Sequence, residues 1–211
     1  MADRIYPIFS KPIYESRLNV PNAKMAYVLN FLKNNNYANY KNSIKLDIGT
    51  KTNYVLDIDK FKFLKNAILQ KFNLYAKQEL KHNNKWQITT SWFAKTENGE
   101  EGNYHIHENS FYSGVFYLST PNNCGDISFI NFASRNLALT YTDYNILNSR
   151  KWSINPQEQN ILFFPSDVYH KIEQNNSGKS RYSLSFNIMP KGTIQEANMS
   201  DTIITLGNVN E

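Results

Sequence analysis

The chain has 211 residues, which suits one domain or one domain with a helical extension. Its 41% hydrophobic content can form a core, yet no apolar run reaches the roughly 20 residues that a membrane span needs. The start of the sequence lacks signal-peptide features, and the single cysteine, Cys124, excludes an internal disulfide. We therefore expect a reduced, cytoplasmic setting and no membrane partner. A net charge of +5 attracts anionic partners, but no nucleic-acid-binding motif accompanies it, and we interpret the charge as that of a solvated surface.

The first part of the sequence is predicted to be helical. Residues 22–33 carry apolar side chains at helical spacing, and residues 59 to about 81 carry a longer apolar stripe. Asn22 and Asp59 stand where they would cap these two helices. The polar stretch 34–52 between the helices is expected to be irregular.

From Trp86 onward the apolar period changes to two, which is typical of strands. Turn residues separate the expected strands at 86–94, 104–107, 113–119, 126–130, 137–141, 160–164, 168–172 and 181–188. Residues 202–206 are a candidate for one more strand. Strands of this number and spacing favour a sandwich or barrel, the double-sheet jelly roll included.

Two of the four histidines form the sequence His105-Ile106-His107. Residues two apart in a strand point to the same face, so both imidazoles project together. Such a pair suits a single metal ion, because neutral imidazole binds Fe, Zn, Cu and Ni. Two surface or hydrogen-bonded histidines are the alternative interpretation of so short a motif.

His170 lies in a second apolar strand, on the face that also carries Val168 and Ile172. That face is expected to be mostly core, so the imidazole needs a hydrogen-bond partner or a metal. In a chain with four histidines, another one that points inward favours a site with three histidine ligands.

The strand expected at 181–188 alternates cleanly between polar and apolar residues. Its polar face carries Arg181, Ser183, Ser185 and Asn187. One such face meets water or a polar cavity while the other packs on the core. If this strand is a hairpin neighbour of the His170 strand, Arg181 offers its planar guanidinium to a carboxylate near the metal, and Ser183 adds a hydroxyl. The hydroxyl of Tyr117 can reach the same ligand, although tyrosine more often packs in a core.

Four motifs follow one another along the chain: His-x-His-x-Asn-Ser, Ser-Gly-Val-Phe-Tyr-Leu, Phe-Pro-Ser-x-x-x-His and Arg-Tyr-Ser-x-Ser-Phe-Asn. In order and spacing, the region from Trp92 to Pro190 resembles the 2-oxoglutarate and iron(II) dependent oxygenases. More narrowly, it resembles a branch of that superfamily from bacteria and bacteriophages. The resemblance implies a mainly β fold with N-terminal helices. Residues 1–85 would form a helical segment packing on the sheet, and residues 86–211 a double-stranded β-helix (a jelly roll of the cupin-like kind), within a single domain overall.

The resemblance also implies roles for individual residues. His170 corresponds to the distal metal ligand of the family. Arg181 and Ser183 correspond to the clamp on the far carboxylate of 2-oxoglutarate, and Tyr117 to a tyrosine that often contacts the same co-substrate. No catalytic residue beyond the metal site is implied.

The first motif departs from the family, because His107 stands where Asp or Glu is expected. Three neutral ligands would leave the iron with one more positive charge than the usual two histidines and one carboxylate. We predict His105, His107 and His170 as the iron ligands. Asn109 is the alternative ligand, through its carbonyl oxygen; Glu108 would need a bulge, and Asp126 is more remote.

The implied activity is that of an iron(II)- and 2-oxoglutarate-dependent dioxygenase, of the hydroxylase type. It consumes O2 and 2-oxoglutarate, decarboxylates the latter oxidatively and removes hydrogen from a prime substrate. A cupin-like three-histidine iron dioxygenase that needs no 2-oxoglutarate is one alternative. A non-enzymatic jelly-roll binding or structural protein is another. The prime substrate and the oligomeric state are not readable; family analogy slightly favours a protein or peptide over a small metabolite or a nucleic acid.

Overall fold

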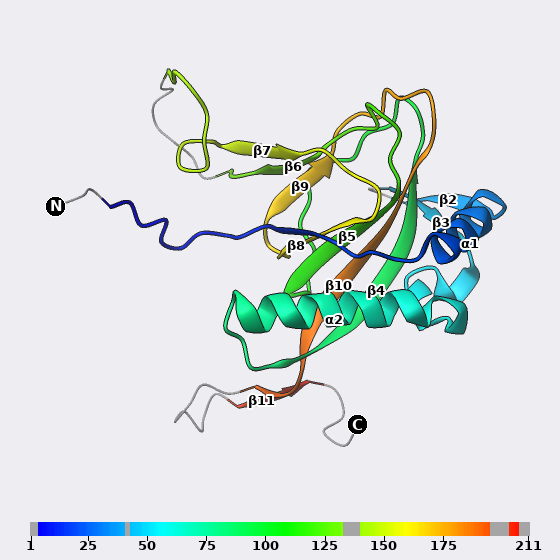
Figure 1. The fold of residues 1–211 in the computed structure, drawn as a ribbon, viewed down its shortest axis with the longest axis horizontal. Coiled ribbons are helices and arrows are strands. Elements are labelled where there is room, and N and C mark those ends of the chain that lie inside the picture. Colours follow the sequence, from blue (N-terminus) through cyan, green and yellow to red (C-terminus); the bar gives the residue numbers. More distant parts are fainter. Residues whose placement is uncertain (1–3, 41–42, 133–139, 195–202, 207–211) are drawn as a thin grey trace.

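Two antiparallel sheets face each other, and helices cover the outer face of the larger one (Figure 1). The computed structural model describes residues 4–40, 43–132, 140–194 and 203–206. Within these ranges no helix combines the length and the apolar character that crossing a membrane requires.

The larger sheet has eight strands. Its order is β1 (Tyr14–Arg17), β8 (Asn160–Pro165), β5 (Tyr112–Ser119), β10 (Arg181–Ile194), β4 (Lys85–Thr96), β3 (Ser43–Leu46) and β2 (Tyr37–Tyr40), and β11 (Ile204–Leu206) pairs with the end of β10. The long strand β10 therefore lies at the centre, hydrogen-bonded to β4 on one side and to β5 on the other. Its register against β4 shifts between Asn187 and Ile188.

The smaller sheet has the order β7 (Lys151–Ile154), β6 (Ile127–Ile130) and β9 (Tyr169–Ile172). An antiparallel bridge between His105 and His170 adds the segment around His105 to the free edge of β9. From β4 onward the chain alternates between the two sheets, with one hairpin, β6–β7, within the smaller sheet. This is the double-stranded β-helix, so the predicted mainly β fold with N-terminal helices is confirmed.

Helices α1 (Asn22–Lys33) and α2 (Lys62–Gln78) pack on the outer face of the larger sheet (Figure 1). The buried stripe of α2 consists of Leu64, Ile68, Phe72, Tyr75 and Ala76. Three short 3-10 helices precede α2: η1 (Gly49–Lys51), η2 (Val55–Asp57) and η3 (Asp59–Phe61). The main hydrophobic core forms between these elements and the apolar outer faces of β5, β8 and β10.

Several local expectations were wrong. The second helix begins at Lys62 after the 3-10 turn, and neither Asn22 nor Asp59 caps a helix with its side chain. The stretch 34–52 contains the hairpin β2–β3, which its polar composition concealed. Strands β1 and β7 were also missed. Residues 104–107 contribute a single bridge, not a regular strand. The strand expected at 137–141 falls mostly outside the described residues.

A second, smaller core lies between the two sheets. It consists of Val115, Tyr117, Ile127, Phe129, Leu162 and Phe164. The polar face of β10 points into the same interior: Arg181 is 1% exposed and Ser183 is 2% exposed. The alternation seen in this strand therefore reflects a polar cavity and not a solvent-facing side.

Phe72 connects α2 to the larger sheet and provides a test of this packing. Its ring lies 5.1–6.1 Å, centroid to centroid, from the rings of Tyr75, Trp86, Tyr112 and Phe163. We expect Phe72→Ala to lower the free energy of unfolding by about 3–5 kcal/mol, because it leaves a cavity in the main core. Leu74→Ala, at a position of the same helix that is 47% exposed, is the control. Equal losses in urea denaturation of the two variants would contradict the described core.

Candidate active site

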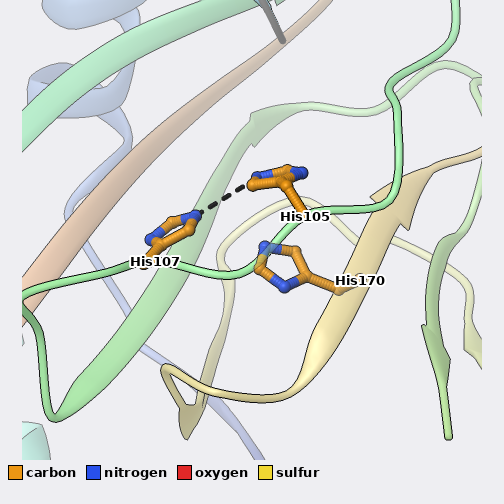
Figure 2. A group of neighbouring side chains, drawn as sticks. All are labelled: His105, His107 and His170. Atoms are coloured by element: carbon orange, nitrogen blue, oxygen red, sulfur yellow. Dashed lines mark hydrogen bonds between the residues drawn. The ribbon is translucent and has the colours of Figure 1, made fainter. Parts of the chain in front are cut away.

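Three imidazoles converge inside the fold (Figure 2). His105 and His107 lie in the segment between β4 and β5, and His170 lies on β9. The ring centroids of His105 and His170 are 4.5 Å apart, and His107 lies 5.2 Å and 5.0 Å from them. One nitrogen from each ring lies within 4.8 Å of the other two. The structure thus brings together the three residues that the sequence singled out.

Backbone carbonyl groups orient two of the rings. Nδ1 of His105 lies 2.8 Å from the carbonyl oxygen of Asn103, and Nδ1 of His170 lies 2.9 Å from that of Val168. A carbonyl oxygen can only accept a hydrogen bond, so each Nδ1 carries the proton. Each Nε2 is then left with a free lone pair, as in histidines that bind metal ions.

A side-chain network orients His107. Its Nδ1 lies 2.5 Å from Oδ1 of Asn187 and 2.9 Å from Oγ of Ser113. The amide of Asn187 is itself held, because its Nδ2 donates to Oγ1 of Thr90 at 2.9 Å. Ser113 continues the network to Oγ of Ser166 at 2.8 Å. Since Asn187 presents its oxygen, Nδ1 of His107 donates the hydrogen bond and its Nε2 is also free.

The environment keeps two of the rings neutral. Burial lowers the pKa of His107 to about 4, an effect that its hydrogen bond to Asn187 opposes. Burial lowers the pKa of His170 to about 3, and the neighbouring imidazoles add to this effect. Nε2 of His107 faces Nε2 of His105 at 3.3 Å (Figure 2). Two ligands roughly 2.1 Å from a metal ion and at right angles to each other would be about 3 Å apart. The three donors therefore fit a divalent metal ion.

A second group of polar atoms lies buried on the same side of the larger sheet. The guanidinium of Arg181 donates from Nη1 to the carbonyl oxygen of Gly125 at 2.8 Å. Its Nε and the hydroxyl of Tyr117 are both buried and without a hydrogen-bond partner among the described residues. The guanidinium carbon lies 5.3 Å from the centroid of the Tyr117 ring. These two neighbouring side chains thus leave buried donors free between the sheets.

The surroundings of Arg181 are short of negative charge. Among the described residues no carboxylate lies within ion-pair distance of Arg181. Burial raises the pKa of Tyr117, so its hydroxyl remains a donor at neutral pH. Ser183 lies directly opposite Tyr117 in the β10–β5 register. A buried guanidinium is costly without an anion, so a bound carboxylate would compensate the charge of Arg181.

The two groups share one surface. The inner face of β10 runs from Arg181 through Ser183 and Ser185 to Asn187, which holds His107. Apolar rings enclose the histidine cluster: the ring of Phe164 lies 4.7 Å and that of Phe129 6.0 Å from His170. Apolar neighbours of this kind limit the access of water to His170.

The alternative ligands lie differently. Glu108 and Asn109 are exposed in the turn after His107, and Asn109 has a φ of 56°. Asp126 instead accepts a hydrogen bond from Asn155. Neither carboxylate belongs to the three-histidine cluster.

The orienting groups of the histidines were not predicted. Asn187 was recognised only as part of a polar face, and no role was inferred for Ser113 or Ser166. The polar-face pattern of β10 was the one signal that pointed to Asn187, whereas backbone carbonyl partners leave no trace in a sequence.

Comparison with known proteins identifies the family. Residues 90–187 match the profile of the family described as "Putative 2OG-Fe(II) oxygenase". This match to the 2OG-Fe(II) oxygenase family covers a little under half of the chain. The matched segment contains all three histidines of the cluster, together with Tyr117, Ser183 and Arg181.

Solved structures share the fold of this chain at low sequence identity. The α-ketoglutarate-dependent epimerase SnoN from nogalamycin biosynthesis has 11% identity and a TM-score of 0.64, covering 90% of this chain and 81% of that one. A prolyl hydroxylase in complex with a peptide fragment, from Trichoplax adhaerens, has 15% identity and a TM-score of 0.58, covering 84% and 83%. HygX from Streptomyces hygroscopicus, with nickel, 2-oxoglutarate and hygromycin B bound, has 9% identity and a TM-score of 0.56, covering 85% and 83%. No curated protein matches the sequence.

The Asn187 contact predicts an effect on metal binding. Asn187→Leu removes the acceptor for Nδ1 of His107, and we expect Mn(II) affinity in calorimetry to fall by roughly 10–100-fold. Asn187→Asp keeps an acceptor at the same place and should keep most of the affinity. Asn160→Leu, at an amide of β8 that binds Glu15, is the control. Equal Mn(II) affinities in the Leu and Asp variants would show that the amide does not support His107.

Proposed function

We propose that this chain is an iron(II)- and 2-oxoglutarate-dependent dioxygenase of the hydroxylase type, with His105, His107 and His170 as its metal ligands. The observation that carries the proposal is the presence of two incomplete sites along one face of β10. One nitrogen from each of the three imidazoles lies within 4.8 Å of the other two, and further along the strand the buried Arg181 guanidinium has no carboxylate partner among the described residues. Iron(II) and the far carboxylate of 2-oxoglutarate would complete both.

The residues of the chain have distinct tasks in this proposal. Bound iron(II), together with 2-oxoglutarate, supplies the activation of dioxygen that this chemistry requires. The three imidazoles hold the metal in fixed tautomers, because each Nδ1 is occupied by an oxygen acceptor. Arg181 anchors and orients the co-substrate by charge, while Tyr117 and Ser183 add hydroxyl donors.

The donor set also favours a second candidate function. No carboxylate of the described residues joins the three histidines, as expected for a cupin-like iron dioxygenase that needs no 2-oxoglutarate. The two candidates differ in what Arg181 does, since only the first requires its pocket. Oxygen consumption that proceeds at full rate without 2-oxoglutarate would favour the second.

The proposal extends to the prime substrate, the cellular compartment and the source of the protein. Among the proteins of similar fold, one is a prolyl hydroxylase in complex with a peptide and another binds hygromycin B. We favour a protein or peptide substrate. A cytoplasmic setting is supported by Cys124, which is buried and free. A bacterial or bacteriophage source rests on the sequence resemblance alone.

Arg181 provides the direct test of co-substrate use. Under anaerobic conditions we expect iron(II) plus 2-oxoglutarate to give a weak visible charge-transfer band. In Arg181→Ala the 2-oxoglutarate concentration at half-maximal band intensity should rise by roughly a hundredfold or more, because a buried charged contact is lost. Arg181→Lys retains a charge and should be intermediate.

Two controls separate this effect from misfolding. Arg17→Ala, on the edge strand β1, should leave the band unchanged. Arg181→Ala should still bind Mn(II), whereas His170→Ala should not. An undiminished band in Arg181→Ala at low 2-oxoglutarate would refute the clamp.

Tyr117 gives a complementary prediction. Its hydroxyl has no partner among the described residues, so Tyr117→Phe removes no hydrogen bond of the free protein. We expect unchanged or slightly higher thermal stability but about tenfold weaker 2-oxoglutarate binding, since a donor to the carboxylate is lost. Titration of the visible band and thermal denaturation measure the two effects. A loss of stability with unaltered 2-oxoglutarate affinity would contradict this assignment.

A further inference from the structure

A lysine stands next to the histidine cluster on a part of the fold that lies outside the β-helix core. Lys45 belongs to β3, which lies between β4 and the edge strand β2 of the larger sheet (Figure 1). Its Nζ lies 4.4 Å from the centroid of the Trp92 ring, and the Trp92 ring lies 5.6 Å from that of His107. The ammonium, the indole and the imidazole thus follow one another toward the proposed metal centre.

The charge of Lys45 reaches the cluster. Burial is the main cause of the lowered pKa of His107, and the electrostatic effects of His105 and of the Lys45 ammonium lower it further. Register explains the approach: Lys45 pairs with Ala94 of β4, whose small side chain lets the lysine lie along the sheet toward Trp92.

The ammonium is held in place but not neutralised. Its Nζ donates to Oδ1 of Asn53 at 3.1 Å and lies 5.1 Å from the ring centroid of Tyr40. No carboxylate of the described residues lies within ion-pair distance of it. Lys95, on the neighbouring strand, is by contrast paired with Glu97. Burial lowers the pKa of Lys45, which shows that its charge is partly desolvated.

These contacts leave N–H donors of the Lys45 ammonium without an acceptor in the described part of the chain. An ammonium group has three N–H donors, and Asn53 takes one of them. The indole face holds the cation by a cation–π interaction and offers an apolar surface beside it. A partly desolvated cation without a counter-charge binds an anion more strongly than a fully solvated surface lysine does.

We propose that Lys45 and Trp92 form a substrate-recognition site that binds an anionic group of the prime substrate, a carboxylate or a phosphate, with an adjoining flat or apolar part on the indole. The anion would anchor the substrate at Lys45, so that a neighbouring carbon lies near the histidine cluster. Lys45 is in this view a specificity-determining residue. The inference rests on the proposed function for the reaction itself, but anion binding at Trp92 can be measured independently.

The first experiment measures the electrostatic potential at Trp92 in the full-length chain without metal. Trp152→Phe serves as the background, because Trp152 is 44% exposed whereas Trp86 is 8% exposed. We expect iodide to quench the remaining fluorescence at least about twofold more effectively than caesium. Lys45→Met should abolish this preference and Lys45→Glu should reverse it, with acrylamide quenching unchanged in both. Lys95→Met is the matched control and should retain the iodide preference.

The second experiment tests recognition with defined probes. The chain loaded with Zn(II) and 2-oxoglutarate is titrated with phenylacetate, phenyl phosphate and the neutral phenylacetamide, and protection of Trp92 from acrylamide is recorded. We expect the two anions to protect, with affinities that fall roughly fivefold in Lys45→Met. The anion that binds more tightly identifies a carboxylate or a phosphate as the natural group.

The outcomes distinguish a failure of the recognition site from a failure of the dioxygenase proposal. Equal protection by phenylacetamide and the anions, or an iodide preference that survives in Lys45→Glu, would overturn the recognition site. Anion-selective protection in a chain that binds no metal would support the recognition site while removing the dioxygenase proposal.

Discussion

The backbone bridge between His105 and His170 is the contact on which the candidate site depends. The two residues exchange N–H···O bonds of 3.0 Å in both directions, which joins a short irregular segment to the edge of β9. Directly opposed residues of an antiparallel pair point to one face, so the bridge brings two imidazoles from distant parts of the sequence together. His107 then follows on the same side, and the third ring completes the cluster without any further rearrangement of the chain.

The architecture resolves a conflict between burial and polarity. The interior between the two sheets contains both an apolar cluster and a row of polar side chains on β10. Asn187 and Ser113 satisfy each other and His107, so this end of the cavity is rigid. Arg181 keeps unused donors at the other end. Buried polar groups that have hydrogen-bond partners hold the side chains in place, whereas buried donors without a partner can bind a ligand.

The sequence predicts those parts of the fold in which apolar residues recur at a regular local spacing. The apolar stripe of α2, the strand series from β4 onward and the alternation of β10 were all readable, and the motif order implied the fold. The hairpin β2–β3 was missed because its short, polar strands are stabilised by pairing with β4, a tertiary effect. The roles of Asn187 and Lys45 were missed for a similar reason. Each depends on a partner from a distant segment, and neither residue type is distinctive on its own.

The attachment of the β2–β3 hairpin has a consequence for motion. β3 is joined to β4 at two residue pairs, whereas β10 and β4 are paired along almost their whole lengths. The hairpin is therefore joined to the β-helix by few backbone hydrogen bonds, and the fully buried side chain of Leu46 adds a hydrophobic anchor in the main core. Because Lys45 stands next to Leu46, any shift of this anchor would also move the ammonium relative to Trp92.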